Sequence, residues 1–289
     1  MSEQNFRPTQ FKLLPEVVKN LLIINGLFFL ATYVCLNTFG IDLVDNLGLH
    51  YIGSDKFKIY QVITHLFMHG SFMHIFSNMF MLWMFGNVLE NYWGGKRFLI
   101  YYLVTGFGAA LMHYIVSYYY DISPVLHAIN DYIANPSSEN LDLFLNQHKI
   151  IITAYSDETA KMMYGEFYNF TNALNFNPND QHALAGTVQF MEYYKGYYLS
   201  EPNIVGASGA VFGVLLAFGM LFPNQLIYLY FAIPIKAKYF VIFYGLFELY
   251  AGISNNASDN VAHFAHLGGM LFGYILIKYW NKSDRQHFY

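Results

Sequence analysis

Six apolar segments recur along this chain, and each is close to the roughly 20 residues that an α-helix needs to cross a bilayer. The segments lie at residues 20–39, 74–92, 98–119, 204–222, 238–254 and 261–280. Only 12% of the 289 residues are charged and 55% are hydrophobic, whereas soluble domains carry about 25% charged residues. The sequence therefore predicts an all-α polytopic membrane protein with six transmembrane helices.

The basic residues predict how the chain is oriented in the membrane. Ten of the fifteen lysines and arginines fall on one side if all six segments cross: Arg7, Lys12, Lys19, Lys96, Arg97, Lys236, Lys238, Lys278, Lys282 and Arg285. Because basic residues collect in cytoplasmic loops, we expect a cytoplasmic N-terminal segment at 1–19 and a cytoplasmic tail at 281–289, in a bacterial inner membrane. Their scatter between apolar segments gives no reason to expect a nucleic-acid partner.

A long polar stretch separates the third and fourth segments. Residues 121–202 carry a net charge of −7, and we expect them to form an extracytoplasmic, mostly helical insert. Helix-start patterns occur at 135–139 and at 179–180, the second before a helical stretch at 181–199. The predicted transmembrane core is then 20–120, with helices 1 to 3, and 203–280, with helices 4 to 6.

A lone hydroxyl opens the fourth segment, in the sequence Gly206-Ala207-Ser208-Gly209-Ala210-Val211-Phe212-Gly213. His266 lies near the same membrane face in the sixth segment, and a histidine in lipid is a candidate functional residue. Both segments carry glycines four residues apart, a spacing that lets helices approach closely: Gly209 with Gly213, and Gly269 with Gly273. We therefore predict a pair in which His266 removes a proton from Ser208, which then attacks a carbonyl.

His74 and Asn78 lie four apart at the same outer end, on one face of the second segment. Both can donate hydrogen bonds to a developing oxyanion; the alternative is that they bind neighbouring helices. No acid is expected to orient His266, because Glu248 lies inside the fifth segment and Asp259 in a loop, so a dyad is predicted. Glu90, at the inner end of the second segment, is expected to cap a helix or to pair with Lys96 or Arg97.

These motifs together resemble the rhomboid intramembrane serine proteases, over roughly residues 20–119 and 203–280. The resemblance implies a six-helix bundle with Ser208 as nucleophile and His266 as general base. It also implies an oxyanion hole formed by the Ser208 backbone N–H, His74 and Asn78, and structural roles for His65 and His69. Two positions depart from the family pattern: Tyr60-Gln61 stands where a Trp-Arg pair is common, and Phe212 where many relatives have tyrosine.

The resemblance implies a serine endopeptidase that cleaves transmembrane segments of other proteins near the outer membrane face. Its expected partners are those substrates and the membrane lipids, and no cofactor or metal is expected. Two other readings stay open. One is an inactive relative that binds membrane proteins without cutting them; the other is a metal site or transporter, because His263 and His266 have a plausible one-turn ligand spacing.

Overall fold

The computed structural model describes residues 11–153, 156–229, 232–254 and 262–286. Three parts of the chain lie outside these ranges. They are the first ten residues of the predicted N-terminal segment, with Arg7; most of the loop at 254–260, with Asp259; and residues 287–289. The chain divides into two compact units. We call residues 1–48, 60–113 and 204–289 the bundle unit, and residues 49–59 and 114–203 the insert unit.

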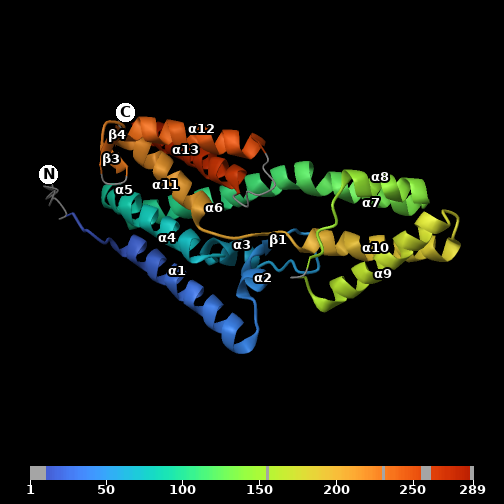
Figure 1. Ribbon diagram of the computed structural model, residues 1–289. Helices are drawn as coiled ribbons and strands as arrows, with labels where there is room; N and C mark the ends of the chain where they lie inside the picture. Colours follow the sequence, from blue (N-terminus) through green and yellow to red (C-terminus); the bar gives the residue numbers. More distant parts are fainter. Residues whose placement is uncertain (1–10, 154–155, 230–231, 255–261, 287–289) are drawn as a thin grey trace, which may run out of the picture. The chain divides into compact units, whose positions relative to one another are not determined.

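The bundle unit contains helices at all six predicted segments (Figure 1). Short helices and π-helical turns connect or extend some of them. The elements are α1 (Glu16–Val34) with η1 (Cys35–Phe39), α2 (Leu43–Leu47), α3 (Gln61–Thr64), η2 (His65–Phe67), α4 (Phe72–Met81), η3 (Leu82–Gly86), α5 (Asn87–Trp93), α6 (Gly95–Ser117), α11 (Ser208–Leu221), α12 (Ala237–Ser254) and α13 (His263–Gln286).

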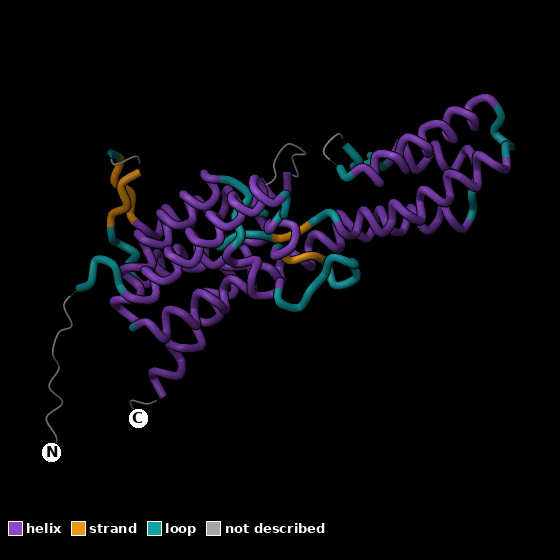
Figure 2. The backbone as a smooth tube through the Cα atoms, turned by 90° about the horizontal axis from the view of Figure 1, so that it is seen from below, coloured by secondary structure: helices purple, strands orange, loops and turns teal. Residues whose placement is uncertain are grey.

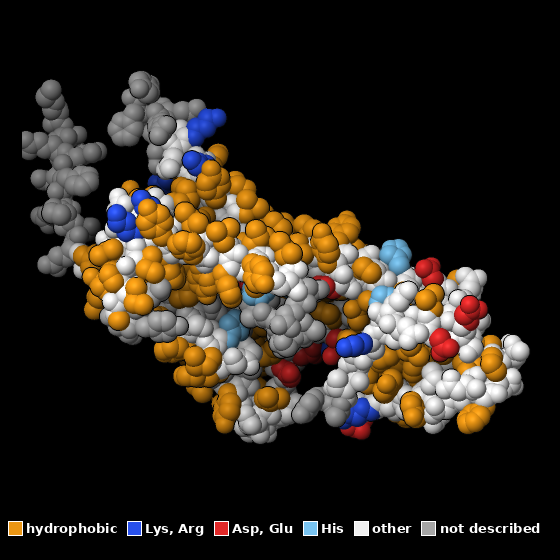
Figure 3. All heavy atoms as spheres, turned by 45° about the horizontal axis from the view of Figure 1, so that its top comes forward, with side chains coloured by type: hydrophobic (Ala, Val, Ile, Leu, Met, Phe, Trp, Pro, Cys, Tyr) orange, Lys and Arg blue, Asp and Glu red, His pale blue; other side chains and the backbone are white. Residues whose placement is uncertain are grey.

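Three helical stretches are long and apolar enough to cross a membrane, namely Glu16–Phe39, Phe72–Trp93 and Gly95–Ala134. Helix α11 is apolar but has only 14 residues. Large apolar side chains are exposed on the outer helices, among them Leu27 on α1 and Phe243 on α12, and Figure 3 shows hydrophobic side chains over much of the visible face. These features fit a helical protein in lipid, while six membrane crossings stay a prediction.

Helix α11 is the central helix of the bundle unit. Ten of its fourteen residues are buried, from Gly209 to Gly219, and it contacts α13, α12, α4 and α5. A helix that is apolar on every side is expected in the interior of a bundle. The surrounding core includes the fully buried rings of Phe98, Tyr101 and Tyr102 on α6. The helix that begins at Ser208 is therefore held on all sides.

The third predicted segment does not end at residue 119. The chain stays helical through η4 (Tyr118–Ile122) and α7 (Ser123–Ala134), so the first helix of the insert continues the helix of the third segment. Pro124 follows the π-helical turn η4, where the regular α-helical hydrogen bonding changes. The insert unit also includes residues 49–59 of the first loop, which the sequence had not associated with the insert.

The insert unit is mostly helical, with α7, α8 (Ser138–Gln147), α9 (Glu158–Phe176) and α10 (Gln181–Ser200). Both predicted helix starts are confirmed. Ser137 caps α8 by accepting from the N–H of Asn140, and Asp180 caps α10 by accepting from the N–H groups of His182 and Ala183. The two short strands β1 (Leu49–His50) and β2 (Asn203–Ile204) lie at the ends of its segments.

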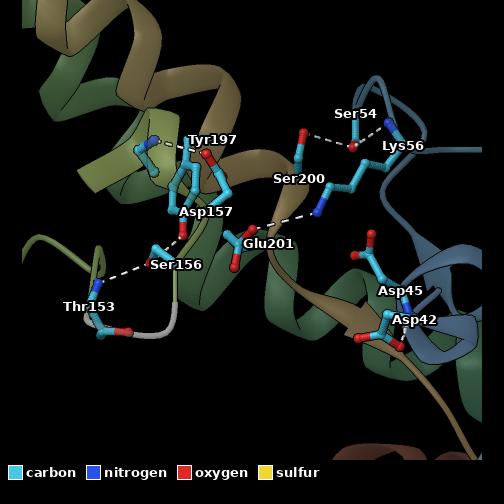
Figure 4. Close-up of polar contacts among 11 residues, drawn as sticks. Asp42, Asp45, Ser54, Lys56, Thr153, Ser156, Asp157, Tyr197, Ser200 and Glu201 are labelled. Carbon is cyan, nitrogen blue, oxygen red and sulfur yellow. Dashed lines mark hydrogen bonds and ion pairs between the residues drawn. The ribbon is translucent and has the colours of Figure 1, made fainter. Parts of the chain in front are cut away.

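The insert helices run side by side (Figure 2) and enclose a core of their own. The rings of Phe167 and Phe190 stack with 4.0 Å between centroids. Polar contacts tie residues 49–59 to the end of α10: Ser54 Oγ donates to Ser200 Oγ at 2.9 Å and Lys56 pairs with Glu201 at 3.5 Å (Figure 4). The insert unit thus has the packing of an independent folding unit.

A β-hairpin that the sequence did not predict connects α11 to α12. Strand β3 (Leu226–Leu229) pairs antiparallel with β4 (Ile233–Lys236), with Leu226 opposite Lys236 and Leu229 opposite Ile233. Its residues lie between the predicted segments at 204–222 and 238–254, a stretch for which the sequence predicted no secondary structure.

Candidate active site

Ser208 is the first residue of α11 and is half-buried. The backbone reaches it through Gly206, whose φ of +117° is strained for residues with a side chain. The N–H of Gly206 donates to the carbonyl of His65 at 2.9 Å. The turn before the serine is therefore fixed by a glycine-specific conformation and by a hydrogen bond to the first loop.

Helices α11 and α13 touch through their backbones at the level of Ser208. A Cβ added at Gly269 would overlap the backbone carbonyl of Gly209, whereas one added at Gly209 would overlap the Cβ of Ala109 on α6. Only glycine permits this approach. The close packing places Ser208, next to Gly209, beside the turn of α13 that carries His266.

The ring of Phe212 links the two helices directly. It stacks on the imidazole of His266 with 3.9 Å between centroids and 5° between planes. Ser208 lies four residues before Phe212 and hence on the same face of α11. Ser208 is thus on the face of α11 whose Phe212 ring contacts His266 of α13, and the predicted Ser208–His266 pair stays a prediction.

His74 lies against the turn that leads to Ser208. A Cβ at Gly206 would be 2.8 Å from His74 Nε2 and 3.8 Å from the backbone N of Ser208. The ring of His74 therefore packs against Gly206, two residues before Ser208. The ring of His74 also meets that of His69 edge-on, with 4.9 Å between centroids.

Asn78 lies one turn after His74 on α4 and is 5% exposed. Its Nδ2 has no hydrogen-bond partner among the described residues. A buried amide donor without a partner is costly, and such groups are common where a ligand or transition state supplies the missing acceptor.

Glu248, on α12, contacts two histidines of α13, which the sequence did not predict. Its Oε2 lies 2.8 Å from Nδ1 of His266 and 2.6 Å from Nδ1 of His263, and all three residues are buried. The expectation that no acid orients His266 is therefore wrong for the described structure. Glu248 and His266 are eighteen positions apart in the sequence, and the contact could not be predicted because it depends on how α12 packs on α13.

The remaining predicted residues support the site from further away. Gly213 and Gly273 do not face each other; both face α6, where Tyr101 Oη donates to the Gly213 carbonyl at 2.8 Å. His65 and His69 are buried in the first loop. Glu90 caps α1, accepting from the N–H groups of Val17 and Val18 at 2.9 and 2.7 Å.

Comparison with known proteins matches the Rhomboid domain model to residues 56–128 and 182–282, which together make up more than half of the chain. The chain belongs to the rhomboid family. The matched segments include Ser208, His266, His74, Asn78 and Glu248, and the gap between them falls within the insert unit.

Curated relatives of this rhomboid chain come from plants and bacteria. Rhomboid-like protein 11, chloroplastic, of Arabidopsis thaliana is 33% identical over 98 residues, 32% of this chain and 34% of the relative. Rhomboid-like protein 15 of the same plant is 23% identical over 154 residues, 53% of this chain and 37% of the relative. Rhomboid protease GlpG of Salmonella newport is 29% identical over 83 residues, 27% of this chain and 29% of the relative. The chain spans about a third of the length of these relatives.

Proposed function

We propose that this rhomboid protein is an intramembrane serine protease that hydrolyses peptide bonds in the transmembrane segments of other proteins. The observation that carries the proposal is the stacking of His266 on Phe212, one turn after Ser208, where α11 and α13 meet through glycines. A relative named as a rhomboid protease supports the same reaction class.

In the proposed mechanism His266 takes the proton of the Ser208 hydroxyl as the oxygen attacks the scissile carbonyl. The tetrahedral intermediate collapses to an acyl-enzyme on Ser208, and His266 gives the proton to the leaving amine. Water then hydrolyses the ester with His266 again as base. Each step uses one serine and one histidine, and no cofactor.

The developing oxyanion needs donors fixed before the reaction begins. His74 packs against Gly206 just before Ser208, and the Nδ2 of Asn78 is buried without a partner among the described residues. We assign the Ser208 N–H, His74 and Asn78 to the oxyanion hole. The buried, partly polar surroundings strengthen each hydrogen bond relative to bulk water.

The predicted orientation places Ser208 toward the outer face of a bacterial inner membrane, with both termini in the cytoplasm. The expected substrates are membrane proteins whose helix can unwind near that face. Apolar residues are exposed on α12, among them Phe243 and Leu246. In the membrane they would face lipid, from which such a substrate approaches.

The test is labelling of the detergent-purified protein by a fluorophosphonate, together with cleavage of a fluorogenic transmembrane peptide. We expect wild type to be labelled and active, and Ser208→Ala and His266→Ala to lose both signals. A folded wild-type protein that neither reacts nor cleaves would identify an inactive family member. Loss of activity on chelation, with the two variants unaffected, would identify the metal-site alternative instead.

A further inference from the structure

Three buried residues form a compact group beside the proposed nucleophile. The Oε2 of Glu248 accepts from Nδ1 of both His263 and His266, at 2.6 and 2.8 Å. Glu248 is 3% exposed and each histidine 8%. Nothing in the proposed dyad mechanism uses the carboxylate or His263, so the group has no role yet.

A carboxylate bonded to Nδ1 determines which nitrogen of an imidazole can act as a base. The Nδ1–H donates to the carboxylate, and the lone pair then resides on Nε2. In serine hydrolases with a triad, the same arrangement holds the histidine in its reactive tautomer and stabilises the imidazolium that forms. Glu248 makes this bond to His266.

The two neighbours of the His266 ring constrain it in different ways. Stacking on Phe212, with 5° between planes, fixes the plane of the ring. A stacked ring can still flip over about its Cβ–Cγ bond, which keeps the plane and exchanges the sides of Nδ1 and Cδ2, and the bond from Nδ1 to Glu248 prevents this flip. We propose that Glu248 is a positioning residue that holds His266 with Nε2 directed to Ser208, completing a Ser208–His266–Glu248 triad. This inference rests on the proposed protease function.

His263 completes the environment of the carboxylate. A buried carboxylate costs free energy unless its oxygens are hydrogen-bonded, and a second N–H on Oε2 supplies one such bond. The two histidines are three residues apart, so one turn of α13 presents both rings to α12. His263 thus helps to hold the carboxylate of Glu248 in place while His266 reacts.

The distances favour shared protons over a metal ion as the link within the group. Two ligands of a tetrahedral zinc ion, each about 2.0 to 2.1 Å from it, would lie roughly 3.3 Å apart. The two N–O separations are 2.6 and 2.8 Å, which are hydrogen-bond lengths. The three ligand atoms, all within 4.8 Å of one another, would have to move apart to admit an ion.

The experiment compares Glu248→Gln with Glu90→Gln in the transmembrane-peptide cleavage assay. Glu90 is a matched control because it is also a buried glutamate of the bundle, 6% exposed, and bonds backbone N–H groups of α1. We expect Glu248→Gln to lower kcat by roughly 10² to 10⁴ with little change in KM. Glu90→Gln should lower thermal stability and leave kcat near wild type.

A second measurement does not depend on turnover. In protein labelled with ¹⁵N-histidine, the Nδ1–H protons of His263 and His266 should appear as low-field signals protected from solvent, assigned with His263→Asn and His266→Asn. Glu248→Gln should shift both signals. Absence of an Nδ1–H signal from His266 in wild type would overturn the proposal, whether or not the protein is an active protease.

These experiments distinguish a failure of the protease function from a failure of the triad. A wild-type protein without labelling or cleavage removes the protease function, and the histidine signals then decide the role of Glu248. An active wild type with an equally active Glu248→Gln variant overturns the triad and leaves the dyad. Inhibition by a chelator that Zn²⁺ reverses would also overturn it, in favour of a metal ion held by these three residues.

Discussion

The imidazole of His266 lies flat on the ring of Phe212, at 3.9 Å between centroids. Aromatic pairs of this kind contribute about 0.5–1.5 kcal/mol beyond the area that they bury. Phe212 stands where the family resemblance implies a tyrosine, and its ring keeps the stacking contact without the hydroxyl group.

Replacing this ring should impair the reaction more than the fold. We expect Phe212→Leu to lower the rate of fluorophosphonate labelling roughly tenfold, the upper end of the stacking energy, and Phe212→Tyr to retain it. Phe218→Leu is the matched control, since Phe218 is on the same helix, is similarly buried and packs at a tilt against Phe85 instead. Equal loss in Phe212→Leu and Phe218→Leu would mean that the ring acts only through stability.

Asn78 should act on the rate of acylation. Removing one oxyanion donor costs about 10² to 10³ in kcat in soluble serine proteases, and we expect a loss of this size for Asn78→Ala in peptide cleavage. Asn87→Ala is the control, because Asn87 is 6% exposed and donates to the Leu13 carbonyl at 2.7 Å. The oxyanion assignment fails if the two variants have the same kcat.

The contact between Gly209 and Gly269 should control stability of the whole bundle unit. A methyl group at Gly269 would overlap the Gly209 backbone, and overpacking of this kind costs about 1–3 kcal/mol, occasionally more. We expect Gly269→Ala to lower the midpoint of thermal unfolding in detergent. Gly26→Ala, on α1 with open space around the added Cβ, should leave it unchanged or raise it, and a fall of equal size in both variants would contradict the prediction.

Two buried histidines of the first loop should make stability depend on pH. Burial lowers the pKa of His65, and burial together with the neighbouring charge of His74 lowers the pKa of His69 to about 4. In the unfolded chain both histidines have a pKa near 6.5. Above that pH neither state binds the extra proton, so the histidines' contribution to the free energy of unfolding is fully present. It should fall as the pH drops from about 6.5 toward 4, for His69 by on the order of 3 kcal/mol.

Thermal unfolding at pH 7.5 and pH 4.5 tests this dependence. His69→Gln should lower the unfolding temperature at pH 7.5 through lost packing, yet lose less on acidification than wild type. A wild-type unfolding temperature that is unchanged between the two pH values would show that neither histidine is buried in the neutral form.

The sequence was sufficient for what depends on local pattern. The helices at the six apolar segments and the caps at Ser137 and Asp180 are readable from neighbours in the chain. The length of the helix that begins at Gly95 could not be predicted in this way. Polar residues begin near residue 119, but no residue between 119 and 123 breaks a helix. The change in composition marks a change in the surroundings of the helix, and the helical backbone continues.

The role of Glu248 could not be read from the sequence for a different reason. A glutamate within an apolar segment signals a partner, but α12 and α13 are separated by residues 255–261, and only packing brings Glu248 to His263 and His266. The His-x-x-His spacing indicates that the two rings share one helical face, but it does not identify the residue that they contact.

Destabilising the core of the insert unit should leave Ser208 reactive. Phe190 is 1% exposed and stacks on Phe167 in the core of this unit, and Phe→Ala in a core costs about 3–5 kcal/mol. We expect Phe190→Ala to speed amide hydrogen exchange and proteolysis within residues 114–203 while fluorophosphonate labelling of Ser208 continues. Phe176→Ala is the control, because Phe176 is 92% exposed and should leave exchange unchanged. Loss of Ser208 labelling in step with the unfolding of residues 114–203 would show instead that the bundle unit depends on the insert for its fold.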